Sequence, residues 1–255
     1  MTQRLEGRTC LITGASSGFG AHFARLAAGE GARVVVAARR RDRVQSLADE
    51  IAAAGGRALA VAMDVTDETS VIAAYDAAYE KYGTIDTIIA NAGVSAPGRS
   101  TEVTVEAIRG VLDTNLLGVL LTAREGAKRL IEAGSAKEGP QGRILLIGSI
   151  TAHMTGQGET IYSASKAGVA HLGRNLAREW VRQGINVNVI QPGYIQTELA
   201  GDWFDSEGGK AQVAGFNRRR LQPIAALDEP VLYFCSDASL HTTGAILTLD
   251  DGQSI

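Results

Sequence analysis

Two side chains in the second half of the chain have types and a spacing that suit proton transfer. Tyr162 and Lys166 lie four residues apart in the run YSASK. Residues i and i+4 of a helix are neighbours on its surface, so a helix here would place a phenol beside an ammonium. A nearby cation favours phenolate, and we expect Lys166 to move the pKa of Tyr162 from about 10 towards neutrality. The pair is therefore predicted to protonate a carbonyl.

The elements that must position this pair can be inferred from the apolar pattern. Short apolar runs alternate with longer helical patterns, which is typical of βαβ units and a parallel sheet. Several predicted strands are apolar throughout, as strands covered on both faces should be. We predict one α/β domain over residues 1–255, a doubly wound Rossmann fold with a seven-stranded parallel sheet flanked by helices. The predicted strands lie near 8–13, 33–38, 57–63, 85–90, 143–148, 185–190 and 245–249, and the helices over 18–29, 41–54, 67–82, 105–133 and 160–183.

Two stretches interrupt this alternation. Residues 133–142 are polar and glycine-rich and are predicted to form an exposed loop between a helix and a strand. Residues 197–220 follow the sixth predicted strand and combine glycines with bulky residues such as Trp203 and Phe204. A long segment at this place is a candidate substrate lid.

Composition and charge exclude several classes of function. The 255 residues carry a net charge of −3 with a pI near 5.9, which argues against a nucleic-acid binder that works by phosphate neutralisation. Cys10 and Cys235 are far apart and lack ligand-spaced neighbours, so we expect ordinary thiols and no metal site. No apolar run is long enough to span a membrane and the first residues are too polar for a signal peptide. We therefore expect a cytoplasmic protein.

A glycine-rich loop follows the first predicted strand and opens the first predicted helix. It runs TGASSGFG from Thr13 to Gly20. Glycines at this place allow a tight turn and a close approach of the backbone, and a helix N-terminus presents free N–H groups to a pyrophosphate. The loop predicts a dinucleotide site, although three glycines can also serve a plain turn between strand and helix.

The residues after the second predicted strand indicate which dinucleotide binds. A dinucleotide fold usually carries an acid there for the ribose 2′-hydroxyl, whereas an arginine accommodates a 2′-phosphate. Here Ala38 is followed by Arg39, Arg40 and Arg41. Arginines in a first helical turn oppose the helix dipole, so a nearby anion would explain their placement better than a solvated basic turn. We predict NADP(H) rather than NAD(H), with Arg39 as the principal contact and Ser16 and Arg40 assisting.

With these residues the chain resembles the short-chain dehydrogenase/reductase family, in its short single-domain branch. The resemblance covers essentially the whole length. It rests on motifs in family order: the glycine loop, Asp64 after the third strand, Asn91-Ala92-Gly93 after the fourth, Asn115, Ser149 after the fifth, Tyr162 with Lys166, and Pro192-Gly193 after the sixth.

The resemblance implies the contacts of a nicotinamide cofactor. Asp64 and Val65 would flank the adenine, and the Asp64 carboxylate would accept a hydrogen bond from its amino group. Residues 91–93 would line the adenosine ribose, and the segment from Pro192 to Thr197 would meet the nicotinamide. The full expected set is Gly14, Ser16, Ser17, Gly18, Phe19, Gly20, Arg39, Arg40, Asp64, Val65, Asn91, Ala92, Gly93, Tyr162, Lys166, Pro192, Gly193, Ile195 and Thr197.

The resemblance also implies a catalytic set of four. Hydride would pass between C4 of the nicotinamide and a carbinol carbon, while Tyr162 gives or takes the hydroxyl proton. Ser149 would donate a hydrogen bond to the same oxygen. Lys166 would lower the pKa of Tyr162 and hold the nicotinamide ribose. Asn115 would hold a water that links Lys166 to solvent.

Three positions depart from the family pattern. Asp251 stands where a second glycine usually follows Asp250, which puts the carry-over of C-terminal oligomer contacts in doubt. Phe19 replaces a smaller isoleucine in the glycine loop and could alter packing beneath the pyrophosphate. Ser17 is not an arginine, so the NADP(H) prediction depends on Arg39.

The substrate pocket is expected at the carboxyl ends of the strands. His153 either contacts the substrate or packs at the surface, and Trp203 and Phe204 belong either to the pocket or to the core. The mixture of residue types suggests a medium-sized carbonyl compound with an apolar body. The candidates are Ile150, Thr151, His153, Gln157, Glu159, Tyr194, Trp203 and Phe204.

Three functions are open at this stage. The first is NADPH-dependent reduction of a ketone or a 3-oxoacyl carbonyl to a secondary alcohol. The second is an NAD-dependent alcohol, polyol or hydroxysteroid dehydrogenase that works oxidatively. The third is a non-catalytic nucleotide-binding regulator. By analogy with the family we expect a homotetramer or a homodimer.

Overall fold

The computed structural model describes residues 3–135 and 141–255. Part of the predicted loop at 133–142 thus lies outside the described residues, and residues 133–135 of that loop form turns. In the described part of the chain, no helix is long and apolar enough to cross a membrane.

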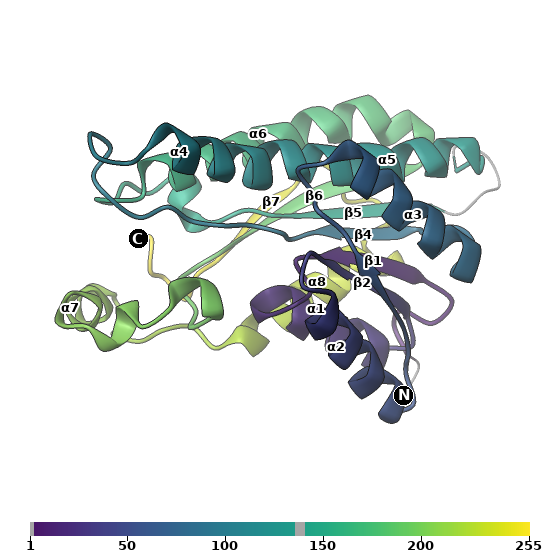
Figure 1. Cartoon of the computed structure of the whole chain (residues 1–255), viewed down its shortest axis with the longest axis horizontal. Helices are drawn as coiled ribbons and strands as arrows, with labels where there is room; N and C mark the ends of the chain where they lie inside the picture. Colours follow the sequence, from purple (N-terminus) through teal and green to yellow (C-terminus); the bar gives the residue numbers. More distant parts are fainter. Residues whose placement is uncertain (1–2, 136–140) are drawn as a thin grey trace.

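Seven parallel strands form one sheet, as predicted (Figure 1). The strand order is β3-β2-β1-β4-β5-β6-β7, so the chain builds outward from β1 on one side and then returns to β4 on the other. In such a fold ligands bind outside the carboxyl ends of the strands, at the point where the winding reverses. Here that point lies between β1 and β4. The strands are β1 Thr9–Thr13, β2 Arg33–Ala38, β3 Arg57–Ala62, β4 Thr87–Ala90, β5 Gly142–Ile147, β6 Ile185–Pro192 and β7 Ile246–Leu249.

Helices cover both faces of the sheet. One hydrophobic core contains side chains of α1, α2 and α8, and the other contains side chains of α3, α5 and α6 (Figure 1). Along β1, Cys10 and Ile12 enter the first core and Leu11 enters the second, which explains why this strand is apolar throughout. The helices are α1 Gly18–Gly29, α2 Arg41–Ala53, α3 Glu68–Tyr82, α4 Val105–Leu112, α5 Gly118–Glu132, α6 Thr160–Trp180, α7 Glu207–Gly215 and α8 Asp228–Cys235.

The long helix predicted over 105–133 is interrupted. A π-helical turn at Asp113–Leu117 separates α4 from α5. A π turn inserts one residue into the helical ladder, and such turns are frequent at functional sites. Asn115 lies in this turn and is fully buried.

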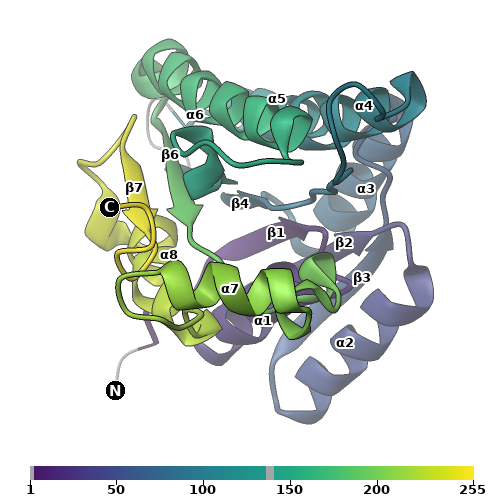
Figure 2. The same ribbon diagram turned by 90° about the vertical axis from the view of Figure 1, so that its left-hand side faces the viewer.

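The segment at 197–220 is more regular than its sequence indicates. Short 3₁₀ turns at Glu198–Ala200 and Trp203–Asp205 precede α7, whose N-cap Ser206 accepts a hydrogen bond from the Gly209 N–H at 3.0 Å. Figures 1 and 2 show α7 outside the two helical layers, at the end of the molecule opposite the amino terminus.

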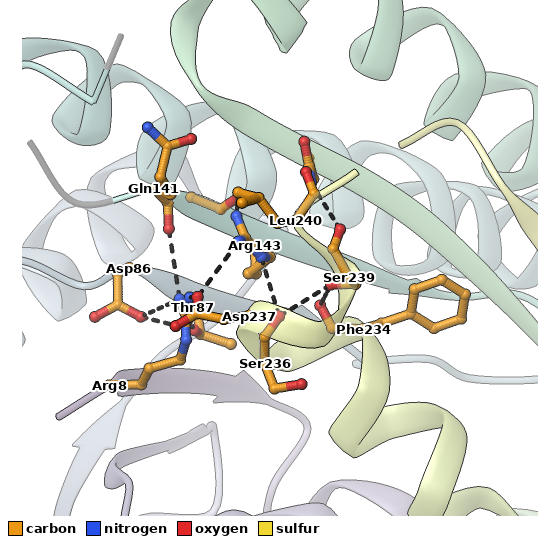
Figure 3. A network of polar contacts seen from close by, with 12 residues as sticks. Arg8, Asp86, Thr87, Gln141, Arg143, Phe234, Ser236, Asp237, Ser239 and Leu240 are labelled. Atoms are coloured by element: carbon orange, nitrogen blue, oxygen red, sulfur yellow. Dashed lines mark hydrogen bonds and ion pairs between the residues drawn. The ribbon is translucent and has the colours of Figure 1, made fainter. Parts of the chain in front are cut away.

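The amino-terminal ends of the strands are held by a polar network (Figure 3). Arg8, just before β1, pairs with Asp86, just before β4, at 3.1 Å and also with Asp237 after α8. Arg143 at the start of β5 is 1% exposed and donates to the Ser236 carbonyl at 3.2 Å. The network therefore lies at the opposite edge of the sheet from the carboxyl ends of the strands.

Candidate active site

The glycine loop lies where the backbone of two strand ends meets. A Cβ placed on Gly14 would lie 2.8 Å from the Cα of Ala92, and one on Gly20 would lie 2.5 Å from the Gly14 carbonyl oxygen. Both distances are shorter than real side chains tolerate. The Thr13 hydroxyl accepts from the Asn91 N–H at 3.0 Å, and so joins β1 to β4. Close packing of the loop therefore explains why Gly14 and Gly20 cannot carry a side chain.

The loop leaves helix donors unused. Ser17, the N-cap of α1, makes no side-chain capping hydrogen bond, so the first turn offers N–H groups to an anion. Phe19 packs against Phe23 with ring centroids 5.9 Å apart, which places its larger side chain against the first core. The glycine cradle and the uncapped helix fit the pyrophosphate of a dinucleotide.

A cavity of about 370 Å³ begins at this loop and extends to the proton-transfer pair. Most of the expected cofactor residues line it, which supports their grouping. Four do not: Gly20 packs beneath the loop, Pro192 ends β6, Gly193 packs against Gln253, and Ile195 is buried in the first core. The lining residues on the expected list are Gly14, Ser16, Ser17, Gly18, Phe19, Arg39, Arg40, Asp64, Val65, Asn91, Ala92, Gly93, Tyr162, Lys166 and Thr197.

Sequence reasoning missed eight residues that line the cavity. Four of them share a signal that could have been used, because Ala38 and Ile147 end strands of the sheet and Met63 and Gly148 directly follow strands. Glu198 and Leu199 belong to the predicted lid, and the sequence offers no sign that they reach the cofactor side. The eight are Ala38, Met63, Val94, Thr114, Ile147, Gly148, Glu198 and Leu199.

The arginines after β2 have different surroundings. Arg40 donates to the Ser16 hydroxyl from Nε and Nη2 at 3.1 and 2.9 Å, and from Nη2 to the Ser17 hydroxyl at 3.0 Å. Its Nη1 pairs with Glu198. Arg39, expected as the principal contact, is exposed, and no hydrogen bond or ion pair engages its side chain among the residues described. Both arginines line the cavity mouth, but Arg40 is the one fixed in place.

Asp64 lines the cavity after β3 and accepts hydrogen bonds from its own neighbourhood. Its Oδ1 accepts from the N–H and the hydroxyl of Thr66 at 3.0 and 2.8 Å. Burial acts to raise the pKa of Asp64, but these hydrogen bonds and the charge of Arg39 together lower it. An ionised carboxylate here can accept from an outside donor such as an adenine amino group.

The proton-transfer pair lies at the other end of the cavity. Tyr162 and Lys166 are on the first turns of α6, and the Lys166 ammonium is 5.6 Å from the centre of the Tyr162 ring. Lys166 Nζ donates to the Ile147 carbonyl at the end of β5, at 2.9 Å. The expected side-by-side placement is therefore present, although the ammonium is directed at the backbone.

The expected direction of the Tyr162 pKa shift is wrong for the free protein. Burial raises the pKa of Tyr162 to about 12, while a hydrogen bond with Ser149 lowers it and the charge of Glu159 raises it. Burial also lowers the pKa of Lys166 to about 8. Desolvation is the largest cause of the shift of the Tyr162 pKa, and the Lys166 ammonium donates to the Ile147 carbonyl instead. At neutral pH Tyr162 is therefore a phenol, the form that donates a proton.

Asn115 is held in the interior by its own amide. Its Oδ1 accepts from the Val94 N–H at 2.8 Å, and its Nδ2 donates to the Val94 carbonyl at 2.9 Å and to the Ser165 hydroxyl at 3.1 Å. Ser165 in turn donates to the Tyr162 carbonyl at 2.6 Å. Asn115 thus connects Val94, in the segment after β4, to α6, the helix that carries Tyr162 and Lys166.

Ser149 lies beyond the end of β5 and faces Tyr162. Its Oγ accepts from the N–H and hydroxyl of Thr151 at 3.2 and 3.0 Å. Ser149 and Thr151 are both buried. Because Thr151 supplies two donors, the Ser149 hydroxyl can direct its own proton to Tyr162 or to a reacting oxygen, as an oxyanion donor must.

The substrate candidates lie outside the cavity that begins at the glycine loop. None of the eight lines the cavity described above. Glu159 accepts from the Tyr194 hydroxyl at 3.2 Å, and the Tyr194 ring stacks on Phe216. His153 and Gln157 are exposed, and Ile150 is buried. The structure thus groups Glu159 and Tyr194 near Tyr162.

The outer candidates belong to the lid segment and its surroundings. Trp203 is 52% exposed and donates to Gln212 on α7 at 2.7 Å, while Phe204 packs edge-on against Tyr194. Asp251, the departure from the double glycine, has a φ of 53° and pairs with Arg220 at 2.8 Å. A left-handed backbone therefore persists at this position without a glycine.

Within the described residues, no group of His, Cys, Asp and Glu side chains is arranged to hold a metal ion. Cys10 and Cys235 are buried free thiols. Near the end of the cavity the structure brings together a phenol, an ammonium and a hydroxyl, those of Tyr162, Lys166 and Ser149.

The fold and this site define a nicotinamide-dinucleotide oxidoreductase of the Rossmann type. Residues 8–208 match the family model described as short chain dehydrogenase, and the chain belongs to this family. It is 37% identical to cis-4-hydroxycyclohexanecarboxylate dehydrogenase of Sinomonas cyclohexanicum, over 100% of this chain and 99% of that protein.

Two solved structures have the same fold over almost the full length. Gluconate 5-dehydrogenase of Burkholderia cenocepacia J2315, in complex with NADP and tartrate, has a TM-score of 0.92 and 28% identity, covering 99% of this chain and 97% of that one. The 3-ketoacyl-(acyl-carrier-protein) reductase of Brucella melitensis, complexed with NADH, has a TM-score of 0.88 and 32% identity, covering 98% and 100%.

Proposed function

We propose that this protein reduces a ketone to a secondary alcohol with NADPH, with Tyr162 as the proton donor. The observation that carries the proposal is the position of Tyr162 and Lys166 at one end of a cavity whose other end is an uncapped helix and a glycine cradle, with Ser149 hydrogen-bonded to Tyr162. Bound nicotinamide would supply the hydride. The chain supplies the rest: Ser149 and Tyr162 hold the carbonyl oxygen, and Tyr162 gives it a proton.

The protonation state of Tyr162 in the free protein suits the role of proton donor. With a pKa of about 12 in the free protein, the phenol keeps its proton at neutral pH. A proton donor is needed when hydride reaches a carbonyl carbon and charge develops on the oxygen. Alcohol oxidation needs the phenolate, which is the minor form under these conditions.

NADP(H) is proposed as the preferred cofactor because Arg39 and Arg40 line the cavity mouth after β2. No carboxylate follows β2 at the place where NAD-binding proteins hold the ribose 2′-hydroxyl. A guanidinium is always charged and binds phosphate through paired donors. The NADP bound to the gluconate 5-dehydrogenase fits this proposal, whereas the NADH bound to the 3-ketoacyl reductase shows that the fold serves both cofactors.

A second candidate function is oxidation of a cyclic or polyhydroxylated alcohol. Glu159 and the Tyr194 hydroxyl form a polar pair near Tyr162, and such a pair can accept from and donate to a further substrate hydroxyl. The names of the cyclohexanecarboxylate and gluconate dehydrogenases agree with alcohols of this kind. Of the three proteins named above, the 3-ketoacyl reductase is the one whose name agrees with a 3-oxoacyl substrate.

The test is a matrix of cofactors and substrates. NADPH and NADH consumption is measured with cyclic ketones, keto sugars and 3-oxoacyl thioesters, and NADP and NAD reduction with the matching alcohols. The proposal expects the highest kcat/KM for NADPH with a ketone. Preference for NADH would contradict the cofactor, and turnover of alcohols alone would favour the second candidate.

Two expectations about the whole molecule stay predictions. We propose a homotetramer or homodimer, which light scattering after size exclusion tests. The exposed apolar side chains Leu112, Leu117 and Ile131 of the α4 to α5 region offer a surface for such contacts. A cytoplasmic location is proposed from the charge and hydropathy of the chain, and fractionation of the source cells tests it.

A further inference from the structure

A glutamate of the lid segment occupies the arginines at the mouth of the cofactor cavity. Glu198 begins the short turn after β6, and its two oxygens pair separately with Arg40 Nη1 at 2.5 Å and Arg43 Nη1 at 2.7 Å. Arg40 is the N-cap residue of α2, and Arg43 lies in the first turn of that helix. One carboxylate thus joins two segments more than 150 residues apart in the sequence.

This ion pair lies at the cavity. Glu198 and Arg40 both line it, together with Ser16 and Ser17 of the glycine loop. The chain passes close over that loop, because a Cβ placed on Gly18 would lie 3.7 Å from the Cβ of Thr197. Glu198 is therefore placed where a ligand that enters along the arginines must meet it.

The carboxylate satisfies the donors that a phosphate would use. Arg40 gives Nε and Nη2 to Ser16 and Ser17, and the remaining Nη1 to Glu198. Carboxylate and phosphate oxygens bind a guanidinium in the same geometry. The anion needed to explain arginines at the start of a helix is thus already present in the chain.

We propose that Glu198 is a specificity-determining residue that competes with the 2′-phosphate of NADP(H) for Arg40 and Arg43. A cofactor with a 2′-phosphate displaces the carboxylate and frees the turn at Glu198–Ala200. A cofactor with a 2′-hydroxyl leaves the pair closed. Glu198 therefore lowers the affinity for NADPH relative to NADH. Without Glu198, the arginines would give a stronger preference for NADP(H). The inference rests on the proposed cofactor site.

The first experiment compares cofactor binding in wild type, Glu198→Gln and a control. Glu207→Gln removes the same charge from the same lid segment, where Glu207 is 96% exposed and pairs with Lys210 alone among the described residues. Dissociation constants for NADPH and NADH are measured by nicotinamide fluorescence. Exposed ion pairs contribute little each, so we expect Glu198→Gln to tighten NADPH roughly three- to tenfold and leave NADH nearly unchanged. Glu207→Gln should change neither.

The second experiment separates the 2′-phosphate from the nicotinamide. Adenosine 2′,5′-bisphosphate and 5′-AMP are each added at saturation, and amide hydrogen exchange is followed at residues 197–200. In wild type the bisphosphate should raise exchange there relative to 5′-AMP, because it releases the anchor. In Glu198→Gln the two ligands should give the same exchange.

The outcomes distinguish this inference from the proposed cofactor preference. If wild type prefers NADH and Glu198→Gln shifts binding towards NADPH, the inference holds and the proposed preference fails. If Glu198→Gln changes the two dissociation constants alike, or changes neither, the inference is overturned whichever cofactor wild type prefers. Equal exchange with both adenosine ligands in wild type would also overturn it.

Discussion

Tyr162 is surrounded by groups that decide when its proton leaves. Burial raises its pKa, the hydrogen bond with Ser149 lowers it, and the carboxylate of Glu159 raises it again. Burial also raises the pKa of Glu159 itself, and the hydrogen bond from Tyr194 lowers it. The position of the proton on Tyr162 thus depends on a carboxylate that does not contact the phenol.

We predict that Glu159→Gln moves the pH profile of alcohol oxidation to lower pH. Oxidation needs phenolate, and removing a negative charge beside Tyr162 lowers the pKa at which phenolate forms. The rising limb of kcat/KM against pH measures this. Tyr194→Phe is the control, because it removes the hydroxyl and leaves the carboxylate, so its limb should stay in place. An unchanged limb in Glu159→Gln, or a move to higher pH, would contradict the assignment.

Sequence spacing predicted that Tyr162 and Lys166 are neighbours on a helix, but not their electrostatics. Four residues of helix determine that Tyr162 and Lys166 are neighbours, and a strand end determines where Ser149 lies. The direction of the pKa shift depends on burial and on the Ile147 carbonyl that takes the ammonium. These are tertiary facts, and no local pattern carries them.

Among the secondary-structure elements, β1 and α1 are joined by a glycine loop that packs too closely to leave room for a side chain at Gly14 or Gly20. Gly20 lies in the first turn of α1. A Cβ there would lie 2.5 Å from the Gly14 carbonyl oxygen and 2.7 Å from the side-chain Nδ2 of Asn91. Gly29, at the other end of the same helix, has open space around it.

We predict that Gly20→Ala impairs cofactor binding and stability, whereas Gly29→Ala does neither. An added methyl that forces backbone apart costs about 1–3 kcal/mol and displaces the loop. In an open helical position alanine stabilises by roughly 0.5–1 kcal/mol. Urea unfolding and NADPH titration measure both effects. Wild-type affinity and stability in Gly20→Ala would show that the loop can relax without cost.

Periodicity identified the strands and most helices, and it failed where the backbone departs from regular geometry. The π turn around Asn115 adds one residue to a helix without changing its apolar pattern, so a single helix was predicted over 105–133. The lid segment is rich in glycine and was not predicted to contain a helix. A helix nevertheless forms there, because Ser206 caps the amino terminus of α7. The pairing of Glu198 with α2 joins distant segments and has no local signal.

For the whole molecule, the two ends of the sheet have different tasks. The carboxyl ends carry the cavity, and the amino-terminal ends carry the network of Arg8, Asp86, Arg143 and Asp237. Burial raises the pKa of Asp86 against the opposing effect of its hydrogen bonds and of Arg8. The network joins segments from both halves of the chain, so it is expected to stabilise the fold without touching the chemistry.

We predict that Asp86→Asn destabilises the protein by about 3 kcal/mol, because Arg8 loses its buried carboxylate partner and keeps only the exposed Asp237. Urea unfolding measures the loss, and kcat per folded molecule should be unchanged. Glu50→Gln, which breaks the exposed pair with Arg25, is the control and should barely alter stability. Equal stability of Asp86→Asn and wild type would show that the network contributes nothing net.

The fold class followed from alternation of elements, but this network did not, because its members come from four distant segments. Arg8, Asp86 and Arg143 each stand at the start of a strand, where surface charges are common. Only the assembled sheet brings them together.

The central claim is that Tyr162 gives the proton that accompanies hydride transfer. The most direct measurement is NADPH consumption with an accepted ketone, alongside NADPH binding, in wild type and in Tyr162→Phe. We predict that the variant binds NADPH about as tightly as wild type while its turnover falls roughly 10²- to 10⁴-fold, the usual contribution of a general acid. Turnover within tenfold of wild type would contradict it.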